Sequence, residues 1–157
     1  MLRAYYNRNL RAAWPAAKRS EWHYGEPPAL ATDCVIFDPI GPVLLIRRKH
    51  APCVGSHALP GGFVKVGETV EDACRREVRE ETSIELNELA LIGVYSDLNR
   101  DPRGHIVSVA YTTRLPSDVL PRAGSDATSA EWLDTRQVTL GLDHAQILAD
   151  AKAKIFS

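Results

Sequence analysis

Residues 70–82, VEDACRREVREET, constrain the fold more than any other stretch of this sequence. The run contains neither Gly nor Pro, and Thr69 followed by Asp72 resembles the capping signal of a helix start. These features predict a helix in the middle of the chain. Segments rich in β-branched residues flank it on both sides, so we expect the helix to be part of a mixed domain.

The flanking segments predict strands and one further helix. Alternation and β-branched content predict strands at 32–38, 43–49, 89–96, 105–114 and 129–133. Apolar spacing predicts a closing helix at about 143–156, and the Gly-rich stretch 50–62 is typical of a loop. The expected fold class is therefore α+β, in the form of a layered α/β/α domain.

Residues 1–24 differ from the domain that we expect over 25–157. Five cationic and five aromatic residues occur there with a single acidic residue, Glu21. Because aromatic side chains favour burial, we expect this N-terminal arm to pack on the domain or on a second subunit, as in a homodimer.

Charge and cysteine usage exclude several classes of protein. A net charge of −1 gives no overall attraction to nucleic acid or to anionic membranes. No apolar run approaches the ~18 residues of a membrane span, and the N-terminus lacks the apolar core of a signal peptide. Three widely spaced cysteines without a C-x-x-C pair argue against a disulfide framework or a zinc knuckle. We expect a cytoplasmic protein with no nucleic-acid partner.

The helix carries three glutamates whose charges require compensation. Glu77, Glu80 and Glu81 fall within an arc of about 100° when the stretch is helical. Carboxylates gathered in this way are ligands that Mg²⁺ or Mn²⁺ prefers. The alternative is a solvated surface helix, in which the interleaved arginines screen the carboxylates.

The segment before the helix favours a metal site over a solvated surface. Gly61 and Gly62 form a tight backbone turn, in which a carbonyl oxygen can approach a cation without a Cβ in the way. Glu68 precedes the helix start, so we expect it to lie near the helix and to pair with Arg76.

The stretch from Gly62 to Ile84 resembles the Nudix box, G-x5-E-x7-R-E-U-x-E-E-x-G-U, in which U is aliphatic. The matching residues are Gly62, Glu68, Arg76, Glu77, Val78, Glu80, Glu81 and Ile84. Ser83 departs from the pattern, because it stands where the box has glycine. If Ser83 adopts the left-handed conformation common after a helix, it costs of order 1 kcal/mol; otherwise the helix ends differently. No carboxylate is lost.

The resemblance implies a mixed sheet between helices and hydrolysis of a nucleoside diphosphate linked to another moiety, assisted by Mg²⁺ or Mn²⁺. In the family's pattern, Glu77, Glu80 and Glu81 hold metal and activate water. The carbonyl of Gly61 completes the metal coordination, and Glu68 and Arg76 orient the cluster.

The residues after the box give the best indication of substrate. YSDLNRDPRGHIVSVAY (95–111) resembles a Nudix subgroup of ADP-ribose pyrophosphatases, nicotinamide-nucleotide enzymes and ADP-ribose-sensing repressor domains. We expect Arg100, Asp101 and Arg103 to bind phosphate or ribose, although the same residues also make a good turn. Arg47 and Arg48 end a predicted strand, so alternation brings only one of them to the site; we favour Arg48 for phosphate, and two surface arginines are the alternative.

These observations predict Mg²⁺-dependent hydrolysis of ADP-ribose to AMP and ribose 5-phosphate. The first alternative is a MutT-like nucleoside triphosphate pyrophosphohydrolase. The second is a non-catalytic module that senses ADP-ribose, which would not need three metal-binding glutamates.

Overall fold

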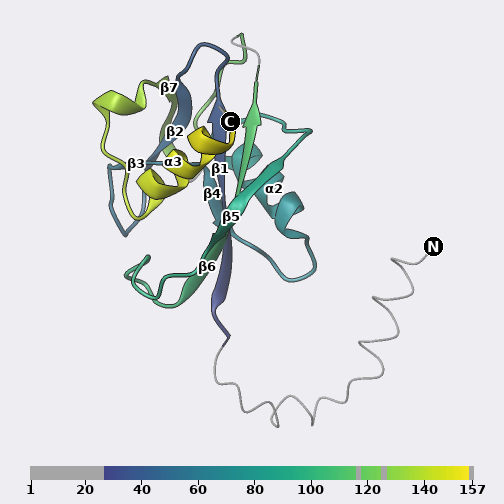
Figure 1. Ribbon diagram of the computed structural model, residues 1–157, viewed down its shortest axis with the longest axis vertical. Coiled ribbons are helices and arrows are strands. Elements are labelled where there is room, and N and C mark those ends of the chain that lie inside the picture. The colour runs from purple at the N-terminus through teal and green to yellow at the C-terminus, as the bar shows by residue number, and fades with distance from the viewer. Residues whose placement is uncertain (1–26, 116–117, 125–126, 156–157) are drawn as a thin grey trace, which may run out of the picture.

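The computed structural model describes residues 27–115, 118–124 and 127–155 (Figure 1). The predicted N-terminal arm, residues 1–24, lies outside the described residues, so its packing and its boundary with the domain stay predictions. The described elements are β1 Ala29–Phe37, β2 Val43–Arg48, β3 His57–Ala58, β4 Gly61–Phe63, α2 Val70–Thr82, β5 Ala90–Tyr95, β6 Ile106–Arg114, β7 Ala127–Leu133, the 3₁₀ turn η2 Thr135–Gln137 and α3 His144–Ile155.

The strands form one mixed sheet of seven strands with β1 near its middle. The main order is β3-β2-β1-β6-β5, while β4 pairs with β1 and β7 pairs with β2. β1 runs parallel to β6 along its whole length, and the other pairs are antiparallel. The predicted mixed sheet is confirmed.

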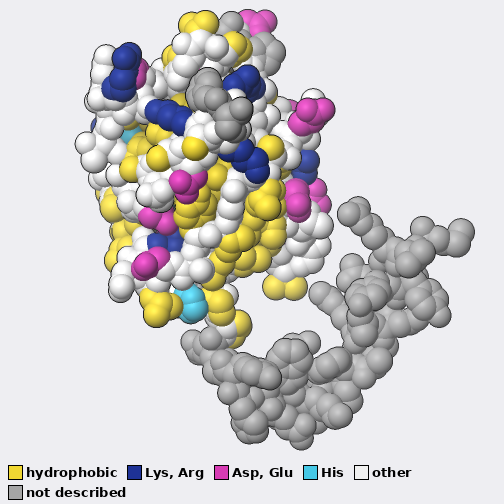
Figure 2. Space-filling model, in the orientation of Figure 1, with side chains coloured by type: hydrophobic (Ala, Val, Ile, Leu, Met, Phe, Trp, Pro, Cys, Tyr) yellow, Lys and Arg dark blue, Asp and Glu magenta, His cyan; other side chains and the backbone are white. Residues whose placement is uncertain are grey.

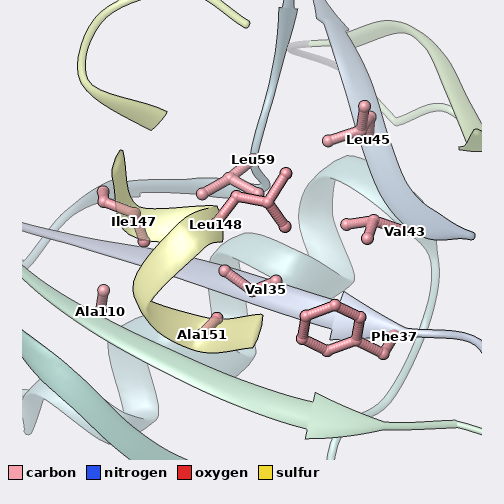
Figure 3. Close-up of a cluster of buried hydrophobic side chains, with 9 residues drawn as sticks. All are labelled: Val35, Phe37, Val43, Leu45, Leu59, Ala110, Ile147, Leu148 and Ala151. Carbon is pink, nitrogen blue, oxygen red and sulfur yellow. The ribbon is translucent and has the colours of Figure 1, made fainter. Parts of the chain in front are cut away.

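Alternation along β1 explains why the sheet has helices on both faces. Val35 and Phe37 belong to a buried cluster with Ile147 and Leu148 of α3, which Figure 3 shows lying over the strand. Cys34 and Ile36 point the other way and pack with Val78 and other residues of α2. A strand buried on both faces separates two helices, so the predicted α/β/α sandwich is confirmed.

The prediction of a loop over 50–62 is wrong in its second half. β3 and β4 lie there, and β4 pairs with β1 through Asp33 opposite Gly61 and Ala31 opposite Phe63. Runs of two and three residues containing His, Ala and Gly carry no β-branched alternation, so pairing with long neighbouring strands fixes them instead.

Helix α2 has the bounds predicted for it, and its two ends are satisfied differently. At the start, the Asp72 amide donates to Thr69 Oγ1 over 3.1 Å. At the end, Ser83 adopts the left-handed conformation, with φ 60° and ψ 20°. The amides of Arg122 and Gly124 donate to the carbonyls of Thr82 and Glu81, at 2.8 and 3.0 Å. A remote backbone segment therefore pairs carbonyls that the helix leaves without partners.

Strand β5 is the outer strand of the sheet beside β6. Figure 2 shows hydrophobic side chains gathered over this region, and Leu91 and Val94 of β5 are 48% and 61% exposed. Exposed apolar patches often mark contact surfaces, whereas the expected homodimer, which the sequence connects with the N-terminal arm, stays a prediction. In the described part of the chain, neither helix has the length and apolar character needed to span a bilayer.

Candidate active site

A pocket of about 380 Å³ lies where β1, β2, β4, α2 and the loop after β5 meet. Acidic and basic side chains both line it, among them Asp33, Arg48, Lys65, Arg76, Glu77, Glu80, Glu81, Arg100, Asp101 and Arg103. A polar cleft with both signs of charge suits an anionic ligand that is held by cations and attacked beside carboxylates.

Arg76 forms hydrogen bonds with three glutamates in the acidic part of this pocket. Its guanidinium donates to both carboxylate oxygens of Glu68, at 3.0 and 2.7 Å. It also donates to Glu77 at 2.5 Å and to Glu80 at 3.2 Å. A further bond of 3.0 Å reaches the carbonyl of Phe63. One arginine thus links the loop before the helix to two glutamates of the helix.

These contacts favour the charged forms of the groups involved. Hydrogen bonding from Arg76, together with the Lys65 amide at 2.6 Å, lowers the pKa of Glu68 to about 2. The same pairing, first with Glu68 and then with Glu77, raises the pKa of Arg76 above its already high ordinary value. Glu68 and Arg76 therefore form a permanently charged pair at neutral pH.

The two glycines of β4 allow close approaches that side chains would block. A Cβ on Gly61 would lie 2.2 Å from the carbonyl oxygen of Thr32. A Cβ on Gly62 would lie 2.5 Å from the carboxyl carbon of Glu77. The amide of Gly61 also donates to Glu81 Oε2 over 3.0 Å. The absence of side chains here lets the turn approach the glutamates directly.

The three glutamates do not form a ready-made metal site. Within the ranges that the structure describes, no three His, Cys, Asp or Glu side chains are gathered closely enough to hold an ion. Glu77 and Glu80 turn to Arg76, and Glu81 turns to the amide of Gly61. Like charges repel, so the carboxylates take the nearest positive partners. The donor types, three carboxylates and the carbonyl of Gly61, nevertheless fit a hard divalent cation.

The two arginines at the end of β2 lie on different sides, as alternation predicts. Arg48 lines the pocket, and its Nε donates to the carbonyl of Pro52 over 2.7 Å. Arg47 is exposed and is not among the lining residues.

The loop residues Arg100, Asp101 and Arg103 line the pocket but pair with other protein groups. Arg100 is buried and donates to both oxygens of Asp143, each over 2.7 Å. Arg103 donates to both oxygens of Asp101, at 3.0 and 2.6 Å. This pairing lowers the pKa of Asp101 and raises that of Arg103. The expectation that all three contact ligand directly is weakest for Arg100, whose guanidinium holds the loop against α3.

The sequence prediction did not include Asp33 and His144, which line the pocket as well. The Asp33 carboxylate accepts from Ser108 Oγ over 2.5 Å and faces His144 Nε2 at 3.5 Å. His144 Nδ1 accepts from the amide of Leu59 over 2.9 Å. The available signal was an aspartate inside an otherwise uncharged strand, where a charge is expensive without partners. The exposed pocket residue Phe63 was missed as well.

Three comparisons place this geometry among known proteins. The sequence model of the NUDIX domain family matches residues 27–153. A relative from Methanocaldococcus jannaschii, named ADP-ribose pyrophosphatase, is 44% identical over 124 residues, which cover 78% of this chain and 72% of that protein.

Two solved structures share the architecture. The NUDIX domain of Shewanella oneidensis NrtR complexed with ADP ribose matches with a TM-score of 0.79 and 24% identity, over 90% of this chain and 99% of that one. A bifunctional NMN adenylyltransferase/ADP ribose pyrophosphatase from Francisella tularensis, complexed with AMP and a Mn ion, matches with a TM-score of 0.74 and 24% identity, over 88% of this chain and 45% of that one. At this identity both show the fold alone.

Proposed function

The chain belongs to the Nudix hydrolase family, and we propose that it hydrolyses the pyrophosphate bond of ADP-ribose to AMP and ribose 5-phosphate with the aid of a divalent cation. One observation carries the proposal: the three box glutamates and arginines from two other segments line the same pocket. The relative named ADP-ribose pyrophosphatase, 44% identical, supports this substrate.

The residues that would hold the cation are Glu77, Glu80, Glu81 and the carbonyl of Gly61. When bound, a divalent cation neutralises pyrophosphate charge and lowers the pKa of a water molecule. To bind the cation, Glu77 and Glu80 would give up their hydrogen bonds with Arg76. Arg76 would keep Glu68 as its partner, because that pair is joined by two hydrogen bonds of its own.

Two arginines outside the box are suited to the phosphates. Arg48 uses its Nε–H to donate to the carbonyl of Pro52 and has further N–H donors on its guanidinium. A guanidinium can pair with phosphate bidentately. Arg103 lies 40% exposed at its side chain while Asp101 holds its orientation. Arg100 is a positioning residue in this proposal, since it fixes the loop that carries Arg103.

The test is turnover of ADP-ribose beside nucleoside triphosphates and other dinucleotides, with Mg²⁺ or Mn²⁺ and an EDTA control. We expect AMP to appear fastest from ADP-ribose and EDTA to abolish the activity. Glu77→Gln should lose turnover while still binding ADP-ribose, whereas the exposed control Glu88→Gln should retain both. Faster release of pyrophosphate from a triphosphate would overturn the substrate assignment. Binding of ADP-ribose without turnover in the unmodified protein would favour a sensing module.

A further inference from the structure

Phe63 is an apolar side chain left exposed at the pocket. It follows Gly61 and Gly62 on β4, lines the pocket and is 43% exposed. The buried clusters of the described residues do not contain it. Leaving part of an aromatic ring in water has a hydrophobic cost that a ligand bound in the pocket would offset.

Arg103 lies over this ring in a fixed orientation. Its guanidinium carbon is 5.1 Å from the centroid of the Phe63 ring. The side chain of Asp101, only 1% exposed, accepts two hydrogen bonds from that guanidinium and a third from the Arg103 amide at 2.9 Å. The planar cation and the ring are therefore held together before any ligand arrives.

The backbone of Phe63 is tied to the glutamate helix. Its carbonyl accepts from Arg76 Nη2 over 3.0 Å, and the same guanidinium contacts Glu77 and Glu80. Pairing of Phe63 with Ala31 fixes the strand from its other side. The position of the ring relative to the carboxylates is consequently set by rigid elements rather than by a mobile loop.

We propose that Phe63, supported by Arg103, is the stacking surface for the base of the nucleotide, and so determines specificity for a nucleoside diphosphate carrying an aromatic base. This rests on the proposed function. A flat π-system is a surface on which a nucleobase stacks, and the guanidinium of Arg103 over the Phe63 ring holds that surface in place.

The test compares the two products as separate ligands, by nuclear magnetic resonance titration in the presence of Mg²⁺. AMP carries the base, and ribose 5-phosphate carries a sugar and a phosphate without a base. Phe63→Ala should weaken AMP binding about tenfold and leave ribose 5-phosphate binding within twofold. Val66→Ala is the matched control, because Val66 lies three residues away, is 94% exposed and is not a lining residue.

Two further variants separate stacking from simple apolar contact. Phe63→Tyr keeps an aromatic face and should bind AMP within twofold of the unmodified protein. Phe63→Leu keeps apolar bulk without that face and should lose affinity nearly as far as Phe63→Ala. Unchanged AMP binding in Phe63→Leu, or a loss confined to ribose 5-phosphate, would overturn the assignment.

Kinetics distinguish this inference from the proposed function. With ADP-ribose, Phe63→Ala should raise KM about tenfold with kcat nearly unchanged, since the ring contacts the base and not the reacting phosphorus. If the unmodified protein does not turn over ADP-ribose, the proposed function fails, yet the AMP titration still decides the role of Phe63.

Discussion

Replacing Gly62 with alanine is expected to stop catalysis without unfolding the protein. The new Cβ would lie 2.5 Å from the carboxyl carbon of Glu77, whereas carbon atoms normally approach to about 3.5 Å. The carboxylate must therefore move by about 1 Å. Because that carboxylate ends a flexible side chain, the move costs little stability, but a displacement of this size in a catalytic group can lower kcat about 100-fold.

Gly61→Ala is the matched comparison, since its Cβ would meet backbone instead. The nearest atom is the Thr32 carbonyl oxygen at 2.2 Å, which belongs to the central strand β1 and cannot turn aside. We expect this variant to lose about 1–3 kcal/mol of stability, as overpacked sites do. Release of AMP from ADP-ribose and urea unfolding should be measured on both variants. If Gly62→Ala keeps full kcat, or loses as much stability as Gly61→Ala, the reasoning about Glu77 is refuted.

Three further substitutions test other parts of the site. Glu68→Gln should remove a stabilising charge, because pairing with Arg76 lowers the pKa of Glu68 from 4.5 to about 2. The Tm of the unmodified protein should therefore exceed that of the variant by its full amount above pH 4.5. This difference in Tm should disappear as the pH falls toward 2. Ser83→Gly should raise the free energy of unfolding by about 1 kcal/mol, because Ser83 has φ 60°. An unchanged free energy of unfolding in urea would contradict the strain at Ser83. Arg48→Ala should raise KM for ADP-ribose about tenfold, while Arg47→Ala, on the opposite side of β2, should leave KM unchanged.

The elements that sequence predicts best are those with local signals. Thr69 as cap and a run without Gly or Pro both act within a few residues, and α2 has its predicted bounds. The strand β1 is marked by its own β-branched content. β3 and β4 lack such signals, because their backbone partners are supplied by residues far away in the chain.

The candidate site shows the same division between local and distant causes. The box spacing predicted that the glutamates lie on one helix, but it could not show that Arg76 donates hydrogen bonds to Glu77 and Glu80. The loop motif suggested ligand contacts for Arg100, but Asp143, 43 residues later, accepts both of its bonds. Side-chain partners of this kind depend on tertiary packing, which a single sequence does not reveal.

The backbone cap on α2 also bears on how the chain can vary over evolutionary time. The connection between β6 and β7 supplies the amides of Arg122 and Gly124, and a Cβ on Gly124 would overlap the carbonyl of Glu80, a box residue. Length changes there should consequently be tolerated unequally. A two-residue insertion after the exposed Leu120 should leave turnover intact, whereas the same insertion after Arg122 should impair it. Equal activity of the two insertion variants would refute this dependence of the glutamate helix on the connection.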